Sequence, residues 1–110
     1  MSTKIGSIVI PVSDIAAAKA VYAALFGAPH TDSPYYVGYK ADGLEIGLTP
    51  QADRDLGPVA YFAVDDLDGT RDKLVSAGSK ERTPPNRVAP GMRVCILEDK
   101  DGNPIGLSGK

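Results

Sequence analysis

The chain carries an internal repeat, because the same succession of patterns occurs in its first and its second half. In each half an alternating apolar segment, 7–12 or 59–64, predicts a strand with one buried face. A helix N-cap follows, from Ser13-Asp14 in the first half and from Asp65-Asp66 in the second, and a helical pattern comes next. Neither half of a 110-residue chain could bury a sufficient core alone, so the two copies are predicted to pool their sheets.

The ends of the two halves also correspond. Segments 42–48 and 101–107 each place an Asp-Gly turn before a strand with an Ile-Gly-Leu core. Another strand pattern precedes each turn, over 35–40 and over 92–98. The intervening stretch 79–90 holds three prolines and predicts a loop with at most a short strand. Each half therefore predicts one strand, one helix and two or three further strands; an ordinary α+β sandwich with an accidental repeat is the alternative.

The two predicted helices end at Gly27 and Gly78, which suit a left-handed terminator. Helical spacing predicts a buried stripe on each of them. The predicted stripe of the first helix comprises Ile15, Ala18, Tyr22 and Leu25. That of the second comprises Leu67, Arg71, Leu74 and Ala77.

Composition excludes several classes of partner. Hydrophobic residues make up 43% and charged residues 24%, as in a globular protein. The formal net charge is −2 without a basic stripe, which argues against nucleic acid as a partner. No apolar run approaches the roughly 20 residues that span a bilayer, so no membrane is expected. Cys95 is the only cysteine, which excludes an internal disulfide and favours a cytoplasmic location.

The segments 12–15 and 21–27 resemble the opening signature of the vicinal-oxygen-chelate superfamily, which contains glyoxalases, bleomycin-resistance proteins and extradiol dioxygenases. Segment 98–105 is similar to its closing signature, with Lys100 where a proline is usual. The resemblance covers nearly the whole chain. It implies an α+β fold in which two βαβββ modules form a curved mixed sheet around a cleft, and it implies a homodimer.

A single domain, 1–110, is expected on these grounds. Module one is expected over roughly 1–50, a polar linker over roughly 51–57, and module two over roughly 58–110.

The resemblance also implies four positions at which metal-using members place their ligands. These positions fall on Ser7, Gly47, Val59 and Gly106. Valine and glycine side chains donate nothing to a metal, and a neutral serine hydroxyl is a weak ligand. His30 and Glu45 are two further donors, and nothing in the sequence places them together. We therefore expect no metal and no other cofactor.

Strand alternation predicts the lining of the cleft. If Ser7 and Gly47 face it, so do their neighbours two residues along each strand. The strand 35–40 also places Tyr35 and Tyr39 on one face, where they either stack on a planar ligand or pack across strands. The predicted ligand-binding residues are Ser7, Val9, Tyr35, Tyr39, Glu45, Gly47, Val59, Tyr61, Gly106 and Ser108.

This lining is mostly apolar, and its two glycines are expected to leave space, which suits a hydrophobic or aromatic small molecule. We expect a metal-free protein that binds such a ligand, as the resemblance to bleomycin-resistance proteins implies. The alternative is a metal-independent isomerase, cyclase or lyase. In that case Glu45 would be the catalytic base, with its pKa raised by burial, and a tyrosine would donate the proton. A metal-dependent glyoxalase or dioxygenase is the least favoured function, and whether the chain is an enzyme stays open.

Overall fold

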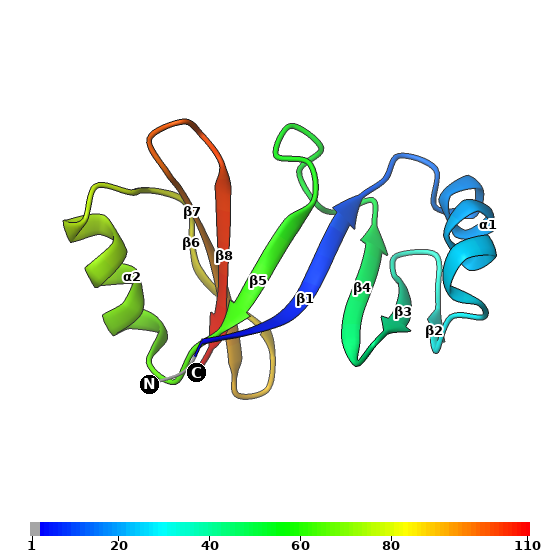
Figure 1. Cartoon of the computed structure of the whole chain (residues 1–110), viewed down its shortest axis with the longest axis horizontal. Helices are drawn as coiled ribbons and strands as arrows, with labels where there is room; N and C mark the ends of the chain where they lie inside the picture. Colours follow the sequence, from blue (N-terminus) through cyan, green and yellow to red (C-terminus); the bar gives the residue numbers. More distant parts are fainter. Residues whose placement is uncertain (1–2) are drawn as a thin grey trace. The chain divides into compact units, whose positions relative to one another are not determined.

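The computed structural model describes residues 3–110 and contains the order strand, helix and three strands twice (Figure 1). The α+β class and the two βαβββ modules are therefore confirmed. Module one comprises β1 (Lys4–Pro11), α1 (Ile15–Phe26), β2 (Thr31–Asp32), β3 (Val37–Ala41) and β4 (Leu44–Thr49). Module two comprises β5 (Val59–Ala63), α2 (Leu67–Ser76), β6 (Lys80–Ala89), β7 (Met92–Glu98) and β8 (Pro104–Gly109).

The described part of the chain divides into two compact units, of which one spans 7–59 and the other joins 60–110 with residues 3–6. Each unit is described by itself, and the shared cleft stays a prediction. No helix within 3–110 is long and apolar enough to cross a membrane.

In module one the strand order is β2-β3-β4-β1, with β1 parallel to β4 and β3 antiparallel to it. The predicted Asp-Gly hairpin turn joins β3 to β4, with φ of +54° at Asp42 and +81° at Gly43. Helix α1 is capped by Asp14, whose carboxylate accepts the Ala17 N–H at 3.1 Å. The helix ends at Gly27, whose φ of +87° favours glycine. The Asp14 cap and Gly27 define the two ends of α1. The helix packs against the sheet over a core of Val37, Tyr39, Ile46 and Leu48.

The inner face of α1 differs from the predicted stripe in one position. Tyr22 packs on the core as predicted, but Leu25 is 73% exposed, and Phe26 packs inward instead. The Phe26 ring stacks on Tyr22, with centroids 6.3 Å apart, and contacts Tyr39 at 5.6 Å. Positions three and four residues beyond Tyr22 both approach its face. The aromatic contact with Tyr39 favours burial of Phe26, four residues after Tyr22, over burial of Leu25. The helical pattern alone could not show this choice.

In module two the strand order is β5-β8-β7-β6, with β5 parallel to β8 and the other pairs antiparallel. Its core comprises Leu67, Cys95, Leu97 and Leu107. Burial raises the pKa of the Cys95 thiol, in agreement with an inert buried cysteine. Asp66 caps α2 by accepting the Gly69 N–H at 3.0 Å.

The loop predicted over 79–90 is wrong, because ten of these residues form strand β6. Its pairing with β7 shifts register between Glu81 and Thr83 and again between Thr83 and Asn86. Pro84 and Pro85 lie within the second shift. Strand β6 is an edge strand of its sheet. Prolines are tolerated at edges and bulges, because no ladder hydrogen bond from their nitrogen is required there.

Replacing Leu48 with Ala tests the core of module one. Leu48 is fully buried, so the cavity should lower the free energy of unfolding by about 2–5 kcal/mol. Val75→Ala, at a 43% exposed position of α2, is the control and should change it by less than about 0.5 kcal/mol. Urea denaturation measures both, and equal effects would contradict the assigned core.

Candidate functional site

The helix-free face of module one carries the residues that alternation predicted for the cleft. In the parallel pair of β1 and β4, Ser7 lies beside Glu45 and Val9 beside Gly47. The residues between them on these strands, such as Ile8 and Ile46, belong to the core beneath α1. Because successive side chains of a strand point to opposite faces, all four predicted residues share the side away from the helix. Their role in binding a ligand stays a prediction.

Glu45 is the centre of a polar cluster on this face, the Glu45 cluster, which also contains Tyr36, His30 and Lys40. The Tyr36 hydroxyl donates a short hydrogen bond to Oε2 of Glu45. Nε2 of His30 lies 2.7 Å from Oε1, and Nζ of Lys40 lies 3.5 Å from the same oxygen. The Glu45 side chain is only 20% exposed. The structure thus brings together His30 and Glu45, which the sequence did not.

The loop before β3 positions Tyr36. Ser33 Oγ accepts the Tyr36 N–H at 3.1 Å, and the Ser33 N–H donates to the Tyr36 carbonyl at 2.9 Å. This tight turn brings Tyr36 back over the sheet. His30 is held by its N–H, which donates to the Gly38 carbonyl at 2.9 Å. Thr31 Oγ1 lies 2.8 Å from Nδ1 of His30, so both ring nitrogens have partners.

Two glycines make room for the cluster. A Cβ at Gly47 would lie 2.5 Å from the Tyr36 hydroxyl oxygen, and a Cβ at Gly38 would lie 2.7 Å from Oε2 of Glu45. These distances are shorter than van der Waals contact, so a Cβ at either glycine would displace the Tyr36 ring or the Glu45 carboxylate from its present position. The expectation that Gly47 leaves open space is therefore wrong, because the Tyr36 ring fills it.

The electrostatics of Glu45 also differ from expectation. Burial is the largest single influence and would raise the pKa of Glu45. Hydrogen bonds from Tyr36 and His30, with the charges of His30 and Lys40, together outweigh it and lower the pKa below its usual value. The same contact acts on Tyr36, since burial and the adjacent carboxylate raise the pKa of its hydroxyl. At neutral pH, Glu45 is therefore an ionised acceptor and Tyr36 a protonated donor.

Of the three tyrosines predicted as ligand contacts, Tyr35 and Tyr39 lie elsewhere. Tyr39 is 1% exposed, and its hydroxyl donates to the Lys19 carbonyl at 3.0 Å, so its prediction as a ligand contact is wrong. Tyr35 is 65% exposed in the loop before β3, off the strand on which it was placed. Tyr36 was missed. In the pair of β3 and β4, Gly38 lies beside Gly47 and Lys40 beside Glu45, so the even-numbered residues of this segment face the Glu45 cluster. This strand register is the signal that identifies Tyr36.

Module two repeats the glycine and tyrosine arrangement. Tyr61 lies beside Gly106 and Ala63 beside Ser108 in the pair of β5 and β8. A Cβ at Gly106 would lie 2.6 Å from Cδ1 of Tyr61, so the ring covers this glycine. Burial raises the pKa of Tyr61. Val59 is buried at the start of β5.

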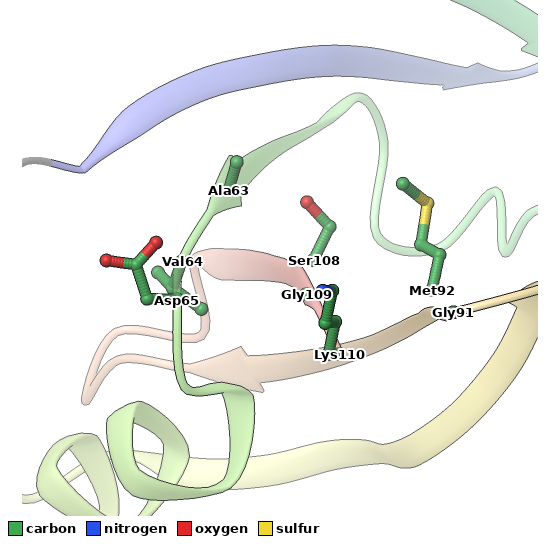
Figure 2. Close-up of a pocket in the computed structure, with 8 residues that line it drawn as sticks. All are labelled: Ala63, Val64, Asp65, Gly91, Met92, Ser108, Gly109 and Lys110. Carbon is green, nitrogen blue, oxygen red and sulfur yellow. The ribbon is translucent and has the colours of Figure 1, made fainter.

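An open pocket of about 370 Å³ lies at one end of the helix-free face of module two (Figure 2). Figure 2 shows Ala63, Met92 and Ser108 with their side chains on the same side of the ribbon. The register explains this placement, because Ser108 pairs with Val94, two residues from Met92. The full lining comprises Ala63, Val64, Asp65, Gly91, Met92, Ser108, Gly109 and Lys110. Of the predicted ligand-binding residues, Ser108 thus lines a pocket.

The four positions implied as metal-ligand sites do not fit a divalent ion. Gly47 and Gly106 lie beneath tyrosine rings, and Val59 has no donor atom. Only Ser7 offers an oxygen, and a neutral hydroxyl is a weak ligand. His30 and Glu45 contact each other, and their donor atoms already have hydrogen-bond partners.

Replacing Tyr36 with Phe should raise the pKa of Glu45 by removing a hydrogen bond that stabilises its charged form. Because the pKa of Glu45 is lower in the folded protein than in the unfolded chain, the ionised carboxylate stabilises the fold at pH values above the unfolded pKa of about 4.3. This stabilisation is lost as the pH falls through the pKa of the folded state. Carbon-detected NMR titration of Glu45 measures the change. The Tyr35→Phe control, at an exposed hydroxyl outside the cluster, should leave the midpoint unchanged, and an unchanged midpoint in Tyr36→Phe as well would contradict the cluster.

Comparison with known proteins gives the family. Two curated proteins named "Putative glyoxylase CFP32", from Mycobacterium bovis and Mycobacterium tuberculosis, are each 28% identical over 110 residues. The match covers 89% of this chain but 42% of the relatives, so the chain spans less than half their length.

Solved structures share the fold. One described as an NAD-dependent benzaldehyde dehydrogenase from Legionella pneumophila has a TM-score of 0.74 at 16% identity and 97% coverage of both chains. A glyoxalase/bleomycin resistance protein/dioxygenase superfamily member from Vibrio splendidus has a TM-score of 0.72 at 11% identity, with 99% of this chain and 100% of that chain covered. These identities show the fold alone. A family model matches residues 4–107, and the chain therefore belongs to the Glyoxalase/Bleomycin resistance protein/Dioxygenase superfamily.

Proposed function

We propose that this protein binds a small, largely apolar organic molecule on a helix-free sheet face, without a resident divalent metal. The observation that carries the proposal is the pocket of module two. Its volume of about 370 Å³ lies within the range of about 300–1,000 Å³ typical of small-molecule sites. It also lies on the face that the strand alternation assigned to the ligand.

The lining of this pocket favours a planar ligand with one polar end. Ala63, Val64 and Met92 supply apolar surface, and a methionine side chain is flexible and contacts aromatic rings favourably. Ser108 adds a hydroxyl that can donate and accept a hydrogen bond, and Lys110 adds a positive charge. An aromatic compound bearing a hydroxyl or carboxylate therefore matches the pocket best.

Two further features remain part of this proposal. The four positions that would hold the family's metal lack adequate donors, which supports a ligand held by packing and hydrogen bonds. We also propose a cytoplasmic location, because Cys95 is a free, buried cysteine and free thiols are typical of a reducing compartment.

The Glu45 cluster favours a second candidate function, metal-independent proton transfer. Glu45 would accept a proton from a carbon beside a carbonyl group, and Tyr36 would return a proton to a neighbouring atom of the same molecule. The contact between a carboxylate base and a protonated tyrosine supports this idea. The lowered pKa of Glu45 weakens it as a base, so only an already acidic C–H bond would react. Ligand binding therefore remains the preferred function.

Binding is tested with a panel of planar aromatic probes, such as phenol, benzoate and indole, by NMR chemical-shift mapping. We expect saturable shifts at Ala63, Met92 and Ser108. Ser108→Ala should weaken binding of the hydroxyl-bearing or carboxylate-bearing probe about fivefold, because one hydrogen bond is worth about 1 kcal/mol. Val88→Ala, at an exposed position of β6 outside the lining, is the control. Shifts that avoid this pocket for every probe would refute the proposal.

Metal content is tested separately. Protein purified without a chelator should hold far less than one divalent ion per chain, and EDTA should not change its melting temperature. Elemental analysis that finds one tightly held zinc, iron or nickel ion per chain would overturn the metal-free part of the proposal.

A further inference from the structure

A salt bridge behind the pocket of module two connects the sheet to helix α2. Arg93 follows Met92 on β7, and successive side chains of a strand point to opposite faces. Met92 lines the pocket, so Arg93 points to the face that α2 covers. There its terminal nitrogens donate to both oxygens of Asp68, Nη2 at 2.7 Å and Nη1 at 3.3 Å. A bidentate pair thus fixes the guanidinium against the first turn of α2.

The same guanidinium also binds the end of β8. Arg93 pairs with Gly109 in the ladder of β7 and β8, and this pairing ends there. Lys110 lies one residue beyond the ladder, and its main-chain oxygen accepts a hydrogen bond from Nη2 of Arg93 at 2.9 Å. One nitrogen therefore bridges Asp68 and Lys110. This bridge fixes a residue whose position the strand pairing does not determine.

The chemistry of arginine suits this bridge. A guanidinium donates several N–H bonds in one plane, whereas a lysine ammonium acts as a single point charge. The hydrogen bond from Arg93 is the largest influence on the pKa of Asp68 and lowers it, so Asp68 stays ionised at neutral pH. The anchor on α2 is therefore charged under the conditions in which a ligand would bind.

Lys110 supplies the positive charge among the described residues that line the pocket (Figure 2). Ser108 comes two residues earlier, and residues two apart along a strand face the same side. A hydroxyl donor beside an ammonium group matches the two oxygens of a carboxylate better than it matches one neutral hydroxyl. Asp65 enters the lining from the end of β5, and its repulsion turns the carboxylate of a ligand toward β8.

We infer that Arg93 is a positioning residue that makes this pocket selective for a carboxylate over a neutral hydroxyl. Arg93 does not line the pocket and does not touch the ligand. It holds the main chain of Lys110 so that the ammonium group stays near Ser108 before a ligand arrives, and less conformational entropy is then lost on binding. The inference rests on the proposed function, because it names the ligand class that the same pocket selects.

NMR titration of the wild type and its variants with benzoate and with phenol tests this selectivity. In Arg93→Gln the affinity for benzoate should fall about threefold to fivefold, the size of one exposed ion pair, and the affinity for phenol should stay unchanged. Arg71→Gln is the matched control. The Arg71 side chain is 30% exposed, as is that of Arg93, and it pairs with Asp72 and Glu81 outside the pocket. An equal loss of both probes in Arg93→Gln overturns the inference.

A double variant separates position from charge. Arg93→Gln leaves the Asp68 carboxylate without its partner, and this free charge repels benzoate as well. Arg93→Gln combined with Asp68→Asn removes one charge of each sign, so the net charge equals that of the wild type while Lys110 is still released. The affinity for benzoate should remain low in the double variant. Recovery of the wild-type affinity would show that Arg93 acts through its charge alone, against the inference.

A measurement without ligand distinguishes this inference from the proposed function. The amide heteronuclear NOE of Lys110 reports its fast main-chain motion and should fall in Arg93→Gln and in the double variant, but not in Arg71→Gln. An unchanged NOE overturns the inference whether or not a probe binds. If both probes bind and Arg93→Gln leaves the ratio of their affinities unchanged, the inference fails and the proposed function stands. If no probe reaches the pocket of the wild type, the proposed function fails and the selectivity fails with it.

Discussion

The parallel pairing of the first and last strand in each module is the constraint on which the rest of the structure depends. In module one it places Ser7 beside Glu45, and the period of two then directs Ile8 and Ile46 toward α1. A slip of one residue would move Glu45 into the core and Ile46 out of it. Such a slip would bury a carboxylate without its partners, so the register is fixed by the same residues that form the polar cluster.

Both modules use this register to place a glycine beneath a tyrosine ring, but they obtain the ring from different elements. In module one Tyr36 comes from the loop before β3, held by its turn with Ser33, and covers Gly47. In module two Tyr61 comes from β5 itself and covers Gly106. The two modules thus share a backbone design and differ in chemistry. Module one carries a hydrogen-bonded polar cluster, whereas module two carries a pocket with apolar walls.

Much of this design could be predicted from the sequence, because it follows local rules. The strand alternation, the Asp-capped helices and the Asp-Gly hairpin each depend on neighbouring residues, and all are present. The placement of Tyr36 could not be predicted. The sequence favoured a strand from Tyr35, but the Ser33 turn delays β3 to Val37, and Tyr39 then points to the core. The choice of Phe26 over Leu25 likewise depended on an aromatic partner distant in sequence, Tyr39.

The energetics of the two helix-free faces support the proposal that a ligand binds to module two. Both oxygens of Glu45 have partners, and Tyr36 is committed to one of them. A ligand that bonds to Glu45 must therefore displace an existing charged hydrogen bond, and the net gain is small. The pocket near Ser108 imposes no such exchange where Ala63, Val64 and Met92 supply apolar walls. Burying those walls under an aromatic ring is favourable in proportion to the area removed from water. The hydrogen bonding of both Glu45 oxygens thus lowers the pKa of that carboxylate and is also the reason why we propose binding rather than catalysis.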